Sequence, residues 1–270
     1  MRSFALAAIL LVSAGAAEAQ TPAICPAPDG RSWIQGDGEC LHVRTFTREV
    51  KDANPVLMVF LHGDRSRGGT VGSQLDFPQR FMGPAVAAVA VLRPGYPSDE
   101  GQRSSGANVR EDHYTEHNAT AVAGAIKRLK EFHKARKLVL VGYSGGAATA
   151  GVIIGKFPHL ADAAVLLACP CDIVKWRSSG RAWTKSLSPS DFAGQVPVGM
   201  RVLALTGRRD TNTTESLARE YVAKLRERGV DAEFRPIADV DHDSIPNSPE
   251  VTATLTEFLK QIAAIETAQQ

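Results

Sequence analysis

The sequence has little of several features that would define other protein classes. Its four cysteines are too few for a disulfide-dense scaffold, and its 31 Lys and Arg residues nearly balance 29 Asp and Glu residues. It has no basic stretch with interleaved aromatic residues, so we expect no nucleic-acid partner. Beyond residue 20, no apolar run has the length of a membrane-spanning helix, so we expect no stable membrane insertion. What is present, 270 residues of which 44% are hydrophobic, suffices for a sizeable core.

The one long apolar run lies at the amino terminus. Arg2 gives a positive charge, residues 4–12 are apolar, and Ala17-Glu18-Ala19 has the small-x-small pattern of a cleavage site. This arrangement predicts a secretory signal peptide at residues 1–19 and a secreted or periplasmic protein. We expect residues 20–270 to form a single α/β domain.

An oxidising compartment allows the cysteines to pair. Cys25 and Cys40 lie close together in a Pro- and Gly-rich segment, and we expect a disulfide between them. Cys169 and Cys171 are separated by one proline, so a bond between them and two free thiols are both open.

The chain is organised around residues 137–146, KLVLVGYSGG. An apolar, β-branched run ends at Gly142, Ser144 follows, and small residues with a helical pattern come next. A buried strand, a sharp turn and a closely packed helix form the context in which G-x-S-x-G presents a nucleophilic serine. The N–H of Gly145 then lies at the start of the helix, where negative charge is favoured.

Strand and helix patterns alternate along the rest of the chain, which predicts a mostly parallel sheet with helices on both faces. In such sheets functional groups gather at the carboxyl ends of the strands. Asp64, Ser144, Asp210 and His242 each follow a predicted strand. We therefore expect these four residues to lie at one edge of the sheet.

Ser144, Asp210 and His242 are the residue types of a nucleophile, an orienting carboxylate and a general base. A serine hydroxyl needs a base to become nucleophilic, and histidine titrates near neutral pH. A carboxylate must orient the imidazole ring. Asp172, which follows the preceding predicted strand, is the alternative carboxylate. We prefer Asp210 because its Gly-x-x-Asp turn follows a clean strand pattern.

The sequence resembles the α/β-hydrolase superfamily over residues 54–265. The matching pieces are His62-Gly63-Asp64, Gly142-Tyr143-Ser144-Gly145-Gly146, Gly207-Arg208-Arg209-Asp210 and Asp241-His242, in the chain order serine, aspartate, histidine. Within the superfamily the sequence is most similar to dienelactone hydrolases and to prolyl-oligopeptidase catalytic domains. The resemblance implies an α/β-hydrolase fold, and we expect no cofactor. The irregular stretch over residues 170–197 is too short for a full lid domain. The resemblance also implies an oxyanion hole made by the backbone N–H groups of Gly145 and Asp64.

Other features have competing interpretations. His113 to His117 matches the H-x-x-E-H pattern of zinc peptidases, but no third ligand is apparent, so we expect no metal. Trp176 and Trp183 either line a substrate pocket or pack beneath a surface loop.

We therefore expect a serine hydrolase that cleaves the carboxylic ester bond of a small molecule. A prolyl-oligopeptidase-like peptidase acting on short peptides is the alternative, and a non-catalytic binding protein on the same fold is a further one. A peptidase usually needs additional recognition elements, and the sequence shows no second domain for them. Glu111 and Asp112 are candidates for binding a substrate amino group, although a charged helix start is the simpler interpretation.

Overall fold

The computed structural model describes residues 24–25, 27–65, 68–107 and 111–264, so the predicted signal peptide at residues 1–19 lies outside the described residues. Within this part the chain forms an eight-stranded sheet with the order β1-β2-β4-β3-β5-β6-β7-β8. The strands are β1 (Trp33–Gln35), β2 (Cys40–Phe46), β3 (Val56–Leu61), β4 (Val86–Val91), β5 (Lys137–Tyr143), β6 (Ala163–Leu167), β7 (Arg201–Gly207) and β8 (Asp231–Ile237).

The sheet is parallel from β4 to β8, and two strands are added antiparallel at one edge: β2 pairs with β4, and β1 pairs with β2. The central strands β3, β5 and β6 are apolar and buried along almost their whole length, as expected for strands covered on both faces. Their register places Gly142 opposite Leu61 and Leu166. The carboxyl ends of β3, β5 and β6 therefore lie side by side, and the loops that follow them meet at one edge.

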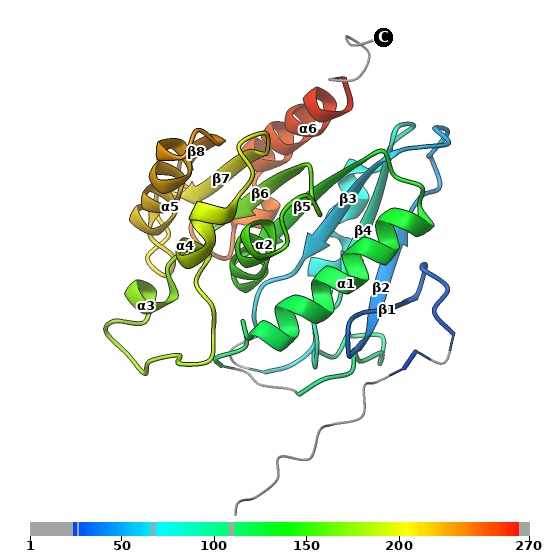
Figure 1. Cartoon of the computed structure of the whole chain (residues 1–270), viewed down its shortest axis with the longest axis horizontal. Helices are drawn as coiled ribbons and strands as arrows, with labels where there is room; N and C mark the ends of the chain where they lie inside the picture. Colours follow the sequence, from blue (N-terminus) through cyan, green and yellow to red (C-terminus); the bar gives the residue numbers. More distant parts are fainter. Residues whose placement is uncertain (1–23, 26, 66–67, 108–110, 265–270) are drawn as a thin grey trace, which may run out of the picture.

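Helices cover both faces of the sheet (Figure 1). The helices α1 (Glu116–Phe132), α2 (Gly145–Lys156) and α5 (Glu215–Glu227) share one apolar core with one set of strand side chains. The helix α6 (Pro249–Ala264) and the 3₁₀ helix η1 (Ser73–Phe81) bury the alternate strand side chains on the other face. This confirms the predicted mostly parallel sheet with helices on both faces.

No lid domain is built into the described residues. Residues 170–197 form a loop with only short helical pieces: α3 (Ile173–Trp176), α4 (Pro189–Phe192) and η2 (Ala193–Gln195). A last short piece, η3 (Ile245–Asn247), precedes α6. In the part of the chain that the structure describes, no helix combines the length and apolar character needed to cross a membrane.

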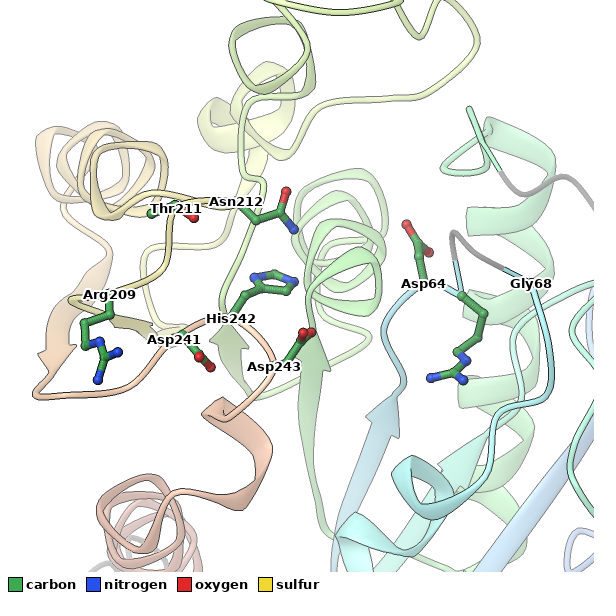
Figure 2. Close-up of a pocket in the computed structure, with 9 residues that line it drawn as sticks. Asp64, Gly68, Arg209, Thr211, Asn212, Asp241, His242 and Asp243 are labelled. Atoms are coloured by element: carbon green, nitrogen blue, oxygen red, sulfur yellow. The ribbon is translucent and has the colours of Figure 1, made fainter.

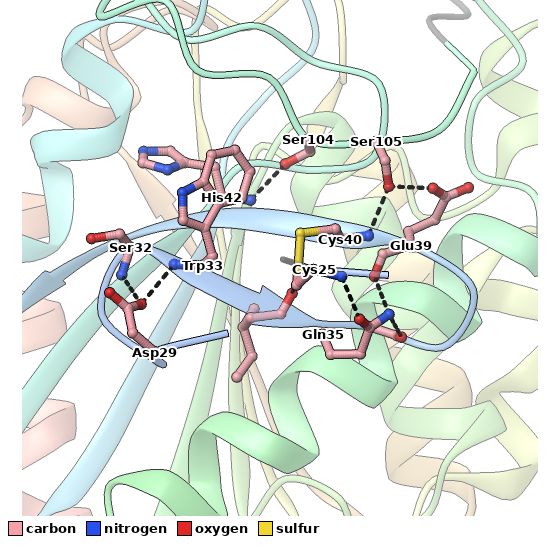
Figure 3. Close-up of a disulfide and its surroundings, with 12 residues drawn as sticks. Cys25, Asp29, Ser32, Trp33, Gln35, Glu39, Cys40, His42, Ser104 and Ser105 are labelled. Carbon is pink, nitrogen blue, oxygen red and sulfur yellow. Dashed lines mark hydrogen bonds between the residues drawn. A yellow bond between two sulfur atoms is a disulfide. The ribbon is translucent and has the colours of Figure 1, made fainter. Parts of the chain in front are cut away.

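The four cysteines form two disulfides. Cys25 is bonded to Cys40, as expected, and ties the segment before β1 to β2 (Figure 3). The Cys25 N–H donates to Gln35 Oε1 at 2.8 Å, which fixes the same segment a second time. Cys169 is bonded to Cys171, which settles the alternative between a bond and free thiols. Both of these cysteines are fully buried just beyond the end of β6.

Candidate active site

Ser144 lies on a strained turn between β5 and α2. Its φ of 52° and ψ of −118° belong to a conformation that non-glycine residues rarely adopt. The flanking glycines are required by close packing: a Cβ at Gly142 would lie 2.6 Å from the Ala147 N atom, and one at Gly146 would lie 2.6 Å from the His62 carbonyl oxygen. Close packing in this strand–turn–helix therefore admits only glycine two residues before and two residues after the serine.

The structure brings Ser144, His242 and Asp210 together in one hydrogen-bonded chain. His242 Nε2 is 2.9 Å from Ser144 Oγ, and His242 Nδ1 is 2.8 Å from Asp210 Oδ2. The Asp210 side chain is fully buried, while that of His242 is 15% exposed. A buried carboxylate at Nδ1 fixes the tautomer in which Nδ1 carries the proton and Nε2 accepts one from the serine.

Asp210 is held by its own turn. Its Oδ1 atom accepts the backbone N–H groups of Asn212 and Thr213 at 2.9 and 2.8 Å. These bonds compensate the cost of burying the charge and aim Oδ2 at the imidazole. The Tyr143 hydroxyl also donates to the His242 carbonyl oxygen at 3.0 Å, which ties the histidine loop to the end of β5.

Sequence reasoning missed one residue that touches the hydrogen-bonded chain. Thr213 Oγ1 is 2.8 Å from Asp210 Oδ2, 3.1 Å from His242 Nδ1 and 3.0 Å from the Ala168 carbonyl oxygen. The residue is fully buried. A threonine three residues after the aspartate carries no recognisable motif, so only the folded turn identifies it.

Asp64 lies beside Gly145, as the oxyanion-hole interpretation requires, and its side chain turns toward a buried polar cluster. The carboxylate forms an ion pair with Arg93 and accepts hydrogen bonds from the hydroxyls of Tyr96 and Tyr114. Burial raises the pKa of Asp64. The Arg93 charge and the hydrogen bond from Tyr114 together lower that pKa by more than burial raises it, so it lies below the ordinary value. The fully buried Arg93 was not predicted, because no sequence pattern links it to Asp64.

A cavity of about 580 Å³ opens beside His242 (Figure 2). Its walls carry polar and charged side chains and one glycine: Asp64, Arg65, Gly68, Arg209, Thr211, Asn212, Asp241, His242 and Asp243. Since the histidine itself forms part of the wall, a molecule in the cavity is within reach of the hydrogen-bonded chain. The lining favours a polar substrate over a lipid.

The alternative carboxylate, Asp172, does not reach the site. It is the first residue before α3, and its Oδ1 atom accepts the Lys175 N–H at 3.0 Å. An N-terminal helix cap accounts for this aspartate.

The H-x-x-E-H pattern does not form the helical turn that a zinc site needs. Helix α1 begins at Glu116, so His113 precedes it and His117 lies within it. His113 Nε2 binds the Pro94 carbonyl oxygen at 2.9 Å, whereas His117 Nε2 binds Glu39 Oε1 at 2.8 Å. The two histidines therefore serve different partners.

Trp176 and Trp183 pack against each other within the 170–197 loop. Their rings meet edge to face at 5.2 Å, and Trp183 meets Tyr114 at 5.3 Å. Trp176 Nε1 donates to the Asn212 carbonyl oxygen at 3.0 Å. Neither tryptophan lines the cavity beside His242, so packing of the loop describes them better than a pocket wall.

An open α/β sheet with this serine elbow at the strand ends defines a serine hydrolase of the α/β-hydrolase fold. The chain belongs to the prolyl oligopeptidase family, whose sequence model matches residues 108–266, more than half of the chain. No curated protein sequence matches the chain significantly.

Solved structures share the fold at low sequence identity. Est1E from Butyrivibrio proteoclasticus, solved with ferulic acid bound, has a TM-score of 0.66 at 16% identity, and the match covers 86% of this chain and 99% of that one. An acylaminoacyl peptidase from Pyrococcus horikoshii has a TM-score of 0.65 at 15% identity, covering 84% of this chain and 40% of that one. A puromycin-hydrolyzing peptidase from Mycobacterium tuberculosis has a TM-score of 0.63 at 16% identity, covering 86% of this chain and 38% of that one.

Proposed function

We propose that the protein is an exported serine hydrolase that cleaves a small, polar carboxylic ester through an acyl-enzyme intermediate. The observation that carries this proposal is the unbroken hydrogen-bonded chain from Ser144 through His242 to Asp210, next to a polar cavity. Ser144 is the nucleophile, His242 the general base and then acid, and Asp210 the carboxylate that orients the ring.

In the first half-reaction Ser144 Oγ attacks the ester carbonyl carbon while His242 Nε2 takes the hydroxyl proton. The tetrahedral intermediate collapses as Nε2 returns that proton to the departing alkoxide oxygen, which leaves an acyl-serine. In the second half-reaction a water molecule attacks the acyl carbon, His242 again relays the proton, and the carboxylic acid leaves. The Asp210 carboxylate stabilises the imidazolium in both halves without becoming protonated.

The N–H groups of Gly145 and Asp64 are proposed to stabilise the negative oxygen of the intermediate. Gly145 is the first residue of α2, so its N–H is one of the donors left without a partner inside the helix. The Asp64 carboxylate is turned to Arg93 and two tyrosines, and its charge is thereby compensated beside the forming oxyanion. Two such donors contribute a large part of the catalysis in comparable sites.

The fate of the acidic pair Glu111 and Asp112 supports an ester over a peptide substrate. Glu111 faces Arg181 at 3.3 Å, and Asp112 accepts the N–H groups of Lys185 and Ser186. Both carboxylates thus have partners in the 170–197 loop, so neither is available to bind a substrate amino group. An alkoxide leaves more easily than an amine, so ester cleavage depends less on binding energy from such a remote contact.

Peptide hydrolysis is the second candidate, and two observations favour it. The family model is that of prolyl oligopeptidases. In addition, Asp241 and Asp243 flank His242 in the wall of the cavity, where they could hold a cationic amino group.

Export is proposed on the sequence of residues 1–19 and on the cysteines. All four cysteines are paired, in the bonds Cys25–Cys40 and Cys169–Cys171. Stable disulfides are typical of oxidising compartments outside the cytoplasm.

The test has two stages. A fluorophosphonate probe should label the wild-type protein on Ser144 and leave Ser144→Ala unlabelled. The values of kcat/KM are then compared on matched substrates with the same acyl group, an alkyl ester and an unactivated amide. A higher value on the amide, reduced selectively by Asp243→Asn, would replace the esterase proposal with the peptidase one.

A further inference from the structure

We propose that Thr213 is a positioning residue of the active site, whose hydroxyl holds His242 and Asp210 in their reactive arrangement and anchors both to the end of β6. This inference rests on the proposed catalytic roles of Ser144, His242 and Asp210. It adds a fourth side chain, one that touches no substrate and acts through the other residues.

The geometry places one hydroxyl among three partners. Thr213 Oγ1 lies 2.8 Å from Asp210 Oδ2, 3.1 Å from His242 Nδ1 and 3.0 Å from the Ala168 carbonyl oxygen. The threonine and aspartate side chains are shielded from solvent, so water does not substitute for these contacts. In such surroundings each hydrogen bond has a larger effect than at the surface.

The hydroxyl has a single proton, which limits how the three contacts are shared. Asp210 Oδ2 and the Ala168 carbonyl oxygen can only accept, and the charged carboxylate, which is also closer, is the stronger acceptor. With Nε2 receiving the Ser144 proton, Nδ1 is a donor, and it faces both Asp210 Oδ2 and Thr213 Oγ1. Thr213 therefore shares its one proton between the carboxylate, the stronger acceptor, and the Ala168 carbonyl oxygen, the weaker one, and accepts a hydrogen bond from the imidazole at the same time.

This double contact restrains the ring more than the carboxylate does alone. Rotation of the imidazole away from Ser144 breaks the Nδ1 contacts to both Asp210 and Thr213. When the ring becomes a cation during catalysis, its Nδ1–H keeps two oxygen acceptors instead of one. Thr213 is thus expected to matter in both half-reactions, because His242 acts in both.

The third contact connects the arrangement to the sheet. Ala168 has a φ of 49° and follows directly on β6, and its N–H donates to the Leu205 carbonyl oxygen of β7. The residue before it, Leu167, accepts the Ser144 N–H at 2.8 Å. The end of β6 therefore supports the nucleophile through Leu167 and the acid–base pair through Ala168 and Thr213.

The experiment compares variants that differ only in the hydroxyl at this position. Thr213→Val keeps the shape of the wild-type side chain and removes the hydroxyl. Thr213→Ser and Thr213→Ala form a second pair, in which only the serine variant carries the hydroxyl. We expect kcat to fall about 10- to 100-fold in the valine and alanine variants, the loss expected for a hydrogen bond to a charged group. KM should change less than about threefold, and serine should restore most of the rate relative to alanine. The control is Thr214→Val, because the hydroxyl of the neighbouring, exposed Thr214 bonds to the Ser216 hydroxyl and not to Ser144, His242 or Asp210.

A spectroscopic measurement makes the inference independent of substrate choice. The low-field proton resonance of His242 Nδ1–H should shift and exchange faster with water in Thr213→Val than in the wild type. Should the wild-type protein fail to react with fluorophosphonate, the proposed function fails, and this resonance still decides the role of Thr213. If the valine variant does not fold, the serine and alanine pair decides it. The inference would be refuted by equal kcat values for wild type and Thr213→Val and for Thr213→Ser and Thr213→Ala, or by an unchanged resonance.

Discussion

The carboxylate of Asp64 lies directly against the Cα atom of Gly145. A Cβ atom at Gly145 would come within 2.6 Å of Asp64 Oδ2, closer than such atoms approach in proteins. The two residues proposed to stabilise the oxyanion are therefore packed against each other, and the site has no room for a side chain at Gly145. Arg93 holds the carboxylate in this place through an ion pair.

We predict that Gly145→Ala displaces Asp64 and lowers kcat at least 100-fold, the typical effect of losing one oxyanion donor. Overpacking should also reduce the free energy of unfolding by about 2 kcal/mol. Ester hydrolysis and urea unfolding measure the two effects. Gly194→Ala is the matched control, because a Cβ at Gly194 meets open space. Equal activity of the two variants would contradict the packing argument.

Substitution of Ser144 should separate activity from stability. Ser144→Ala and Ser144→Gly are both expected to lower turnover about a millionfold. Only glycine relieves the strained φ of 52°. The free energy of unfolding of Ser144→Gly should therefore exceed that of Ser144→Ala by about 1 kcal/mol, with a higher unfolding midpoint. Chemical denaturation of both variants tests this, and a less stable glycine variant would show that the strain is not relieved.

The two candidate carboxylates should respond differently to substitution. Asp210→Asn is expected to lower kcat about ten-thousand-fold, because the amide favours the wrong imidazole tautomer. Asp172→Ala should leave kcat unchanged and cost about 1 kcal/mol of stability through loss of the α3 cap. If Asp172→Ala were the more damaging variant in steady-state kinetics, the assignment of Asp210 would be wrong.

His113 should make the folded state less stable in acid. Burial and the Arg93 charge lower its pKa to about 4, against opposing effects of Asp64 and the Pro94 carbonyl. Between pH 6.5 and pH 4 the unfolded chain binds a proton that the folded protein does not, so stability falls as the pH falls. Between pH 6.5 and pH 4, the different proton binding of His113 in the two states lowers the free energy of unfolding by about 3 kcal/mol.

Urea unfolding at several pH values measures this effect. In His113→Gln the stability should fall less steeply between pH 6.5 and pH 4 than in the wild type. The variant His159→Gln removes an exposed histidine instead and serves as the control. Parallel pH profiles of His113→Gln and the wild type would rule out His113 as the source.

The Cys25–Cys40 bond should stabilise the protein by limiting the unfolded chain. The two cysteines are 15 residues apart, a separation for which the expected effect is about 3 kcal/mol. Peptide mapping without reduction should recover the pair joined, and the double variant Cys25→Ser, Cys40→Ser should unfold at lower denaturant. Recovery of either residue as a free thiol from protein purified without reductant would disprove the pairing.

Much of the site is determined by the sequence alone, because its signals are local. Ser144 is identified by the strand, turn and helix around it, and Asp210 and His242 by their places after predicted strands in a fixed chain order. Parallel strands bring such ends together irrespective of the details of packing.

Other features depend on contacts between segments that are distant in the sequence. Arg93 reaches Asp64 only because β4 pairs with β3, and Thr213 reaches Ala168 only because β6 lies beside β7. His113 and His117 have helical spacing, but the helix begins between them. Periodicity and propensity act along the chain, whereas hydrogen bonds across the fold depend on register and burial. For that reason Ser144, Asp210 and His242 could be predicted from the sequence, and only the tertiary structure decided which residues hold them in place.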